Sequence, residues 1–213
     1  MSAPLKTVVF CDFDGTITSE ETFVAMLKYF TPEVSARVMP ELYQLRMTLR
    51  QGVQEMLQSI PSSRYQEIID FSQTKSIRPG FGELLDYLDS ENIPFVVVSG
   101  GLRIMVETVL AEWKQRVKDI YAVDVNTAGE YFQVLSPMEG ETELVDKVKV
   151  MRGYAPVRTI AIGDSVTDLN MGMQADLVFA RDRLAQYLTE RGKSFIPWEN
   201  FFDILRVLKS GDF

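Results

Sequence analysis

The pentapeptide Asp12-Phe13-Asp14-Gly15-Thr16, which directly follows the apolar run at 8–11, constrains this chain most. A short apolar run of this kind is typical of a buried strand in a parallel sheet. Two carboxylates two residues apart at the end of a strand point into one small volume, where they resist ionisation unless a cation lies among them. The pentapeptide therefore predicts a site for a hard divalent cation, most plausibly Mg²⁺, which binds oxygen ligands and keeps waters that a phosphate can replace. On this stretch alone, an Asx-turn in which the acids cap backbone N–H groups is an equal alternative.

Composition removes several classes of function. The 213 residues include no histidine, which excludes His-based catalysis and His-ligated zinc. The formal net charge is −8 and the basic residues form no cluster, so neither nucleic acid nor an anionic membrane surface is an expected partner. No apolar run is long enough to cross a bilayer, and residues 1–6 lack the pattern of a signal peptide. The lone Cys11 permits no internal disulfide and predicts a small core residue in a reducing compartment, by default the cytoplasm.

Strands alternate with helices along most of the chain, which predicts an α/β fold built on a doubly wound parallel sheet. Between the first two strands, however, helical spacing continues from Thr16 to about Thr74, which is too long for a simple crossover. We therefore expect a core formed by residues 1–18 and 77–213 and an inserted helical cap formed by residues 19–76. Apolar runs predict strands at 7–11, 95–98, 120–125, 131–135, 158–162 and 177–180, the third and fourth forming a hairpin.

Three of the predicted strands end in small or acidic polar residues, namely Asp12, Ser99 and Asp164. In doubly wound sheets the ligand site lies at the carboxyl ends of the strands, near the point where the strand order reverses. These three side chains are therefore expected to converge although they are far apart in the sequence. Such convergence favours the metal site over the Asx-turn interpretation of the pentapeptide.

A second acid pair lies in Gly163-Asp164-Ser165-Val166-Thr167-Asp168. If Asp168 lies on the first turn of a helix, the spacing of four residues brings both acids to one side. Asp164, at the strand end, is then the better metal ligand, and Asp168 is placed to orient a ligand or to hold a lysine. Capping of the helix by Asp164 or Ser165 is the alternative, and it becomes less favoured beside the first acid pair.

Two segments offer groups for a phosphate. Ser99-Gly100-Gly101 provides a hydroxyl and unhindered backbone N–H groups at an expected helix start, where the helix dipole favours an anion, although such a tripeptide is commonly just a turn. Lys147 lies on a helix predicted over 141–151, shortly before the strand that ends at Asp164, and supplies positive charge. Lys149 is its competitor on the same helix, and most lysines on helix surfaces are simply solvated.

These groups together suit phosphoryl transfer through a covalent aspartyl-phosphate. A carboxylate nucleophile divides hydrolysis into two easier displacements, and metal, lysine and backbone donors offset the charge on the transferring group. Asp12 is the expected nucleophile. Asp14 is expected to protonate the leaving oxygen and then to deprotonate the attacking water.

The pentapeptide, Ser99, Lys147 and Gly163-Asp164 with Asp168 occur in the order and spacing of the haloacid dehalogenase superfamily, which the chain resembles over residues 7–180. The resemblance implies a Rossmann-like phosphohydrolase core that depends on Mg²⁺. It implies that Asp12, Asp164 and the backbone carbonyl of Asp14 hold the metal, with Asp12 as nucleophile and Asp14 as acid/base. The insert before Ser99 is similar to the helical cap of the phosphoserine-phosphatase-like branch.

Within that branch, the chain is similar to the methionine-salvage phosphatases, which act on 2-hydroxy-3-keto-5-methylthiopentenyl-1-phosphate. The segments that carry this similarity are 11–18, 51–53, 98–101, 162–168 and 179–182. Phosphoserine phosphatases resemble the chain at Glu21, whose counterpart contacts the substrate amine, but their carboxylate-binding cap arginine falls near Gly52-Val53 here. Because Arg46 and Arg50 lie close by, phosphoserine or another small phosphomonoester stays the alternative substrate.

The expected function is therefore that of a Mg²⁺-dependent phosphatase acting on a small phosphorylated metabolite. A receiver-like phosphoacceptor module is the non-enzyme alternative, but such a module has no use for a long helical insert. The sequence carries no signal for the oligomeric state. The residues expected around the substrate are Glu21, Ser99, Gly100 and Lys147. The cap residues Phe23, Met26, Tyr43 and Met47 are candidates to line a methylthio pocket, although each is better explained as part of the cap's own core.

Overall fold

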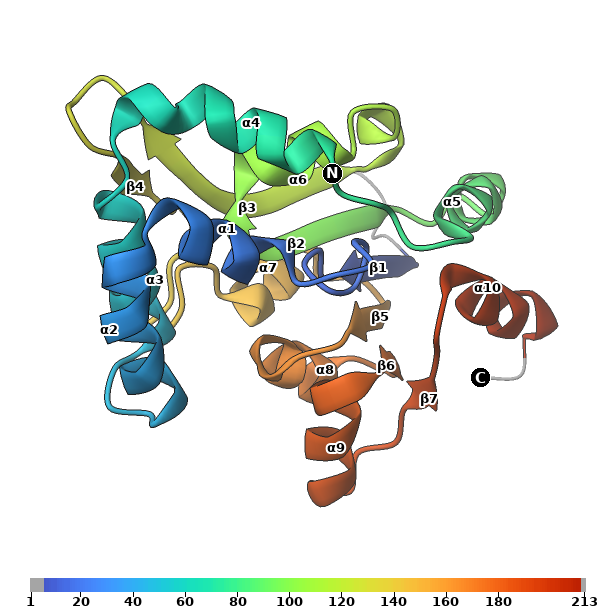
Figure 1. Ribbon diagram of the computed structural model, residues 1–213. Helices are drawn as coiled ribbons and strands as arrows, with labels where there is room; N and C mark the ends of the chain where they lie inside the picture. Colours follow the sequence, from blue (N-terminus) through green and yellow to red (C-terminus); the bar gives the residue numbers. More distant parts are fainter. Residues whose placement is uncertain (1–5, 212–213) are drawn as a thin grey trace.

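The computed structural model describes residues 6–211, which form a seven-stranded sheet with helices on both faces (Figure 1). The strand order is β4-β3-β2-β1-β5-β6-β7, and only the β3–β4 pair is antiparallel. Because the chain order reverses beside β1, the predicted doubly wound α/β fold is confirmed. The strands are β1 (Thr7–Cys11), β2 (Phe95–Leu102), β3 (Asp119–Asn126), β4 (Gln133–Leu135), β5 (Arg158–Gly163), β6 (Leu177–Ala180) and β7 (Ile196–Pro197).

Strand β1 lies in the middle of the sheet because both of its faces are apolar. Val8 and Phe10 join one hydrophobic cluster, and Val9 and Cys11 join the other, all four fully buried. This confirms the expected buried strand and the core position of Cys11. In the ladder Cys11 pairs with Val97 of β2 and Ile162 of β5, so these three strands end at one edge.

Two layers of helices cover the sheet. The cluster around Val9 contains apolar residues of α5 and α10, and the cluster around Val8 contains apolar residues of α7, α8 and α9. Figure 1 shows α5 and α10 together on one side of the sheet and α7 to α9 on the other. The bounds are α5 (Phe81–Ser90), α6 (Arg103–Val109), η2 (Lys114–Arg116), α7 (Lys147–Tyr154), η3 (Val166–Asp168), α8 (Leu169–Gln174), α9 (Asp182–Glu190) and α10 (Phe201–Ser210).

The long insert between β1 and β2 is helical, as its spacing predicted. Its elements are α1 (Thr22–Phe30), α2 (Pro32–Tyr43), α3 (Leu49–Gln58), η1 (Ser62–Arg64) and α4 (Tyr65–Gln73). The chain leaves and returns side by side, since Thr18 forms a β-bridge with Ile77 and the Ser19 N–H donates to the Ser76 carbonyl at 3.0 Å. The division into core and cap stays a prediction, because one hydrophobic cluster joins Met56 and Ile68 of the insert to Phe10 and Val98 of the sheet.

The insert also docks on the β3–β4 hairpin. Pro61 forms a β-bridge with Tyr131, and the Phe132 N–H donates to the Ile60 carbonyl at 3.0 Å. The Phe132 ring packs edge-on against Tyr65 with 6.1 Å between ring centroids. In Figure 1, α4 runs above β3 and α6, while α2 and α3 stand beside β4.

Two local expectations were wrong, and one strand was not expected. The segment Ser99-Gly100-Gly101 does not start a helix but continues β2 to Leu102, and α6 begins only at Arg103. The helix predicted over 141–151 begins at Lys147 instead, because the Asp146 side chain accepts a hydrogen bond from the Lys149 N–H and caps it. Strand β7 is two residues long and gives no periodic signal.

Within residues 6–211, no helix combines the length and apolar character needed to span a bilayer.

Phe132→Ala is expected to lower the free energy of unfolding by about 3–5 kcal/mol, because it removes a ring that is 2% exposed between hairpin and insert. Urea denaturation followed by circular dichroism measures the loss, and both proteins should unfold in one transition because one cluster spans both parts. Leu135→Ala, at a half-exposed position of the same hairpin, is the control and should change stability by less than about 0.5 kcal/mol. A separate early transition in the wild type would contradict the joint core.

Candidate active site

Asp12 and Lys147 form the centre of a buried polar cluster at the carboxyl end of β1. The Asp12 N–H donates to the Ile162 carbonyl at 2.9 Å, which fixes the residue at the edge of the sheet. Lys147 is the first residue of α7, and its Nζ lies 2.5 Å from Asp12 Oδ1 and 2.6 Å from Asp168 Oδ1. The competitor Lys149 is exposed and reaches only the Glu139 carbonyl, at 3.5 Å. The structure therefore brings Lys147, and not Lys149, to the acids.

The second acid pair folds back on the first. Asp168 Oδ2 accepts hydrogen bonds from the backbone N–H groups of Asp164 at 3.1 Å and Ser165 at 3.0 Å. Asp164 Oδ1 accepts a hydrogen bond from Thr16 Oγ1 at 2.9 Å. Oxygens of Asp12, Asp164 and Asp168 all lie within 4.8 Å of one another. The expected convergence of the two acid motifs is thus present, and Asp168 contacts the lysine.

Electrostatics in this cluster favour a cation, because three buried carboxylates face one ammonium. Burial, followed by repulsion from the Asp168 carboxylate, raises the pKa of Asp164 to about 7. Burial and Asp168 also hold the pKa of Asp12 well above its usual range, although Lys147 opposes them. Burial opposes the charge on Lys147, but Asp12 and Asp168 outweigh it and raise the pKa of the amine.

The free oxygens of the cluster fit a hard divalent cation. Among the described residues, Asp12 Oδ2 and Asp164 Oδ2 accept no hydrogen bond, whereas both oxygens of Asp168 are occupied. Oxygen atoms without a hydrogen-bond partner are the donors that Mg²⁺ and Ca²⁺ bind. The chemistry of this donor set therefore agrees with a divalent metal between Asp12 and Asp164.

The Asp14 side chain contacts the start of α1 rather than Lys147. Its Oδ1 accepts hydrogen bonds from the N–H and the hydroxyl of Thr22 and from the Phe23 N–H at 2.9 Å, so it caps the first turn of α1. Burial raises the pKa of this carboxyl to about 6 although the hydrogen bonds from Thr22 lower it. Capping of backbone N–H groups, the alternative to metal binding, is therefore correct for the Asp14 side chain but not for that of Asp12. The N–H groups that Asp14 caps belong to the start of a helix rather than to an Asx-turn.

Two glycines make the close approach of the loops possible. Gly15 has φ +80°, and a Cβ there would lie 2.5 Å from Asp164 Oδ2. A Cβ on Gly163 would lie 2.6 Å from both Cγ and Oδ2 of Asp168. Any side chain at either position would displace an acid of the cluster.

Ser99 and Gly100 lie at the same edge of the sheet, since Cys11 pairs with Val97 two residues before Ser99. Ser99 is fully buried, and its hydroxyl accepts a hydrogen bond from the Gly101 N–H at 3.0 Å. Gly100 is exposed. The helix dipole expected here is absent from this position, because the N-terminus of α6 lies further along the chain.

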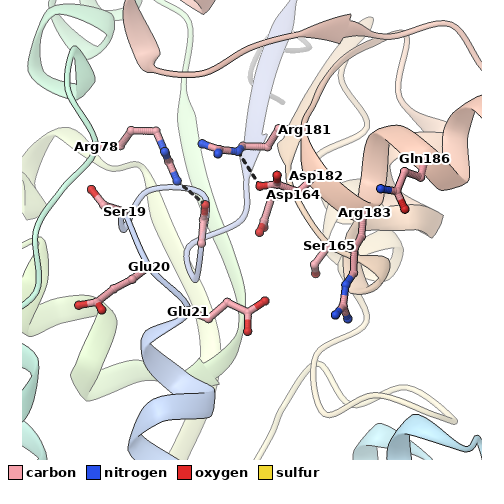
Figure 2. Close-up of a pocket in the computed structure, with 11 residues that line it drawn as sticks. Ser19, Glu20, Glu21, Arg78, Asp164, Ser165, Arg181, Asp182, Arg183 and Gln186 are labelled. Carbon is pink, nitrogen blue, oxygen red and sulfur yellow. Dashed lines mark hydrogen bonds and ion pairs between the residues drawn. The ribbon is translucent and has the colours of Figure 1, made fainter.

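A cavity of about 390 Å³ opens beside Asp164 (Figure 2). Glu21 lines it from the start of α1, as expected for a residue at the hinge into the insert. Arg78, which the sequence analysis missed, donates to the carbonyls of Gly15 at 2.7 Å and Thr16 at 3.1 Å. Arg78 directly follows Ile77, where the chain was predicted to rejoin the core, and this position is the sequence signal that could have identified it.

The cap residues considered from the sequence have other contacts. Arg46 forms an ion pair with Glu41 and Arg50 with Glu139, both at 2.5 Å. Of the four apolar candidates, Met26 is fully buried in the core cluster and Tyr43 is 67% exposed. Phe23 and Met47 pack against that cluster, and only Phe23 reaches the site, where it closes the space over Gly101.

Comparison with known proteins identifies relatives over almost the whole chain. Residues 9–173 match the model of the haloacid dehalogenase-like hydrolase family. A Microcystis aeruginosa protein named 2-hydroxy-3-keto-5-methylthiopentenyl-1-phosphate phosphatase is 52% identical over 96% of this chain and 98% of its own. A Brevibacillus brevis protein of the same name is 33% identical over 96% of each chain. A phosphoserine phosphatase structure from T. onnurineus, 17% identical over 98% of each chain, has the same fold with a TM-score of 0.71.

Gly163→Ala is expected to lower the free energy of unfolding by about 1–3 kcal/mol, because the new methyl group displaces Asp168 from Lys147 and from two backbone N–H groups. Urea denaturation at pH 7 measures the change. The matched control is Gly153→Ala in α7, where a Cβ meets nothing within 4 Å and should raise helix stability by about 0.5–1 kcal/mol. Equal stability of Gly163→Ala and wild type would show that the acid cluster is not closely packed.

Proposed function

The chain belongs to the haloacid dehalogenase-like hydrolases, and on this basis we propose that it is a Mg²⁺-dependent phosphatase that forms an aspartyl-phosphate. Its proposed substrate is 2-hydroxy-3-keto-5-methylthiopentenyl-1-phosphate, for which its 52% and 33% identical relatives are named. The observation that carries the proposal is the buried cluster at the end of β1, where Asp12 has one oxygen on Lys147 and the other free beside Asp164.

In the proposed reaction, an Asp12 oxygen attacks phosphorus, the P–O bond to the leaving group breaks, and Asp14 donates a proton to the departing oxygen. Water then attacks phosphorus, Asp14 accepts its proton, and the Asp12–phosphate bond breaks to release inorganic phosphate. Lys147, fixed by Asp168, offsets charge on the phosphoryl group, with Ser99 beside it. A bound Mg²⁺, held by Asp12, Asp164 and the Asp14 carbonyl, would neutralise further phosphate charge.

In this proposal the phosphate group of the substrate binds at Asp12, and the rest of the molecule occupies the cavity beside Asp164. Phosphoserine, the alternative substrate, has less support. Arg46 and Arg50, the two arginines considered for its carboxylate, are each in an ion pair within the protein. Membership of a hydrolase family leaves a receiver-like module without support. The proposed partner is therefore a small phosphorylated metabolite, and the cytoplasmic location expected from the sequence stays a prediction.

Phosphate release from a panel of phosphomonoesters tests this function. With Mg²⁺ present, kcat/KM for the freshly prepared salvage intermediate should exceed that for phosphoserine and for 4-nitrophenyl phosphate by at least about tenfold, because contacts between the cavity and the non-reacting part of the proper substrate stabilise the transition state. A preference for phosphoserine would overturn the proposed substrate and leave the mechanism in place.

Asp12→Asn is the control for the mechanism. Removing the nucleophile should lower kcat by at least about a thousandfold on every member of the panel and abolish the trapped phosphoenzyme. Asp14→Asn should still trap phosphoenzyme while turnover is impaired. Full activity in Asp12→Asn would exclude the aspartyl-phosphate route.

Metal binding has a readout that does not depend on turnover. Mg²⁺ at about a hundred times its Kd should stabilise the folded protein by about 2.7 kcal/mol and raise Tm by several degrees. Asp164→Asn should lose this shift, because it removes a free carboxylate oxygen of the cluster. Glu91→Gln, at an exposed position, is the control and should keep it. An unchanged shift in Asp164→Asn would place the metal elsewhere.

A further inference from the structure

The cavity beside Asp164 contains two opposite charges that the protein itself leaves unpaired. Seven charged side chains line it, and five of them have partners among the described residues. The contacts are Glu20 with Lys75 (3.2 Å), Asp164 with Thr16 (2.9 Å), Arg181 with Asp182 (2.8 Å) and Arg78 with the Gly15 carbonyl (2.7 Å). Glu21 and Arg183 remain, each without an ion pair or a side-chain hydrogen bond in residues 6–211.

Glu21 and Arg183 approach the cavity from different parts of the fold. Figure 2 shows Glu21 at the start of α1 and Arg183 beside Ser165 on the opposite side of the opening. They form no ion pair with each other. A ligand between them would therefore meet a hydrogen-bond acceptor on one side and a cationic donor on the other.

Arg183 is an exposed side chain at the start of α9. It is the second residue of α9, where the helix dipole favours an acid and disfavours a cation. The preceding Asp182 has φ +45°, a left-handed conformation that side chains rarely adopt and that occurs preferentially at functional sites. The Arg183 side chain lines the cavity at a helix start, has no acidic partner among the described residues, and is therefore available to a ligand there.

The backbone around Arg183 is fixed to the acid cluster. The Leu184 N–H donates to the Asp164 carbonyl at 2.9 Å, and the Arg181 N–H donates to the Gly163 carbonyl at 3.3 Å. These bonds flank Arg183 and hold its Cα at a set position relative to Asp164. The backbone from which the Arg183 side chain extends is therefore fixed relative to the acid cluster.

We propose that Arg183 is a specificity-determining residue that donates hydrogen bonds to a carbonyl oxygen of the substrate, while Glu21 accepts one from the adjacent hydroxyl. This inference rests on the proposed function. The substrate named for the relatives carries a 2-hydroxyl and a 3-ketone next to the phosphate-bearing carbon, which is a donor beside an acceptor. An aryl phosphate has neither group. In the proposed reaction the phosphate lies at Asp12 and Lys147, so Arg183 would act on the remainder of the molecule.

Kinetics of Arg183→Gln on two phosphate esters test the proposal. For the freshly prepared hydroxyketone phosphate, kcat/KM should fall about ten- to a hundredfold, the loss expected for one charged hydrogen bond, mainly through a higher KM. For 4-nitrophenyl phosphate, kcat/KM should stay within about twofold. Arg183→Lys, which keeps the charge but not the forked donor, should recover part of the loss. Arg191→Gln, at the other end of α9, is the matched control and should leave both substrates unaffected.

Three outcomes would overturn the proposal. An equal loss on both esters would mean that Arg183 binds the phosphate, and no loss on either would mean that it is only a solvated surface residue. A selective loss on phosphoserine, without one on the hydroxyketone phosphate, would assign Arg183 to a carboxylate. Failure of the proposed function is distinguishable, because it appears in the wild type as no preference for the hydroxyketone phosphate, whatever Arg183→Gln does.

Discussion

The contacts of the Lys147 ammonium with Asp12 and Asp168 are the interaction on which the site depends. Removing a charge from water is expensive, and a buried carboxylate is tolerated only when a partner compensates it. One lysine compensates two acids here, and Asp168 receives further support from two backbone N–H groups. Lys147 thereby opposes the burial that raises the pKa of Asp12, and it contacts one oxygen of this carboxyl while the other stays free.

The position of this site was largely predictable from the sequence, because parallel strands place their carboxyl ends at one edge. Asp12 and Asp164 end neighbouring strands, so their convergence follows from the strand pattern alone. The sequence already favoured Lys147 over Lys149 although both were expected within one helix, and the structure gives the reason for this choice. It is decided by Asp146, whose side chain begins α7 one residue before Lys147. A single capping carboxylate therefore selects which lysine faces the acids.

The contacts that sequence reasoning missed are long-range and leave no periodic signal. Arg78 donates to carbonyls more than sixty residues away, and only the folded hinge brings them together. The end of β2 was mistaken for a helix start because Ser-Gly-Gly is compatible with both, and the register with β3 shifts within this stretch. Tertiary pairing overrode the local preference there, as it commonly does for glycine in strands.

The contacts of Asp14 link the chemistry to the position of the insert. Its carboxylate oxygen accepts hydrogen bonds from the first turn of α1, yet the proposed acid/base role requires it to reach the leaving group. One oxygen cannot make both sets of contacts fully, so transfer of a proton by Asp14 must be accompanied by a weaker cap or by use of its other oxygen. A weaker cap would alter the start of α1, where Glu21 lines the cavity, whereas use of the other oxygen would leave the cap in place. The proposed proton transfer at Asp14 and the proposed substrate contact at Glu21 therefore both involve the start of one helix, and transfer through the capping oxygen would couple them.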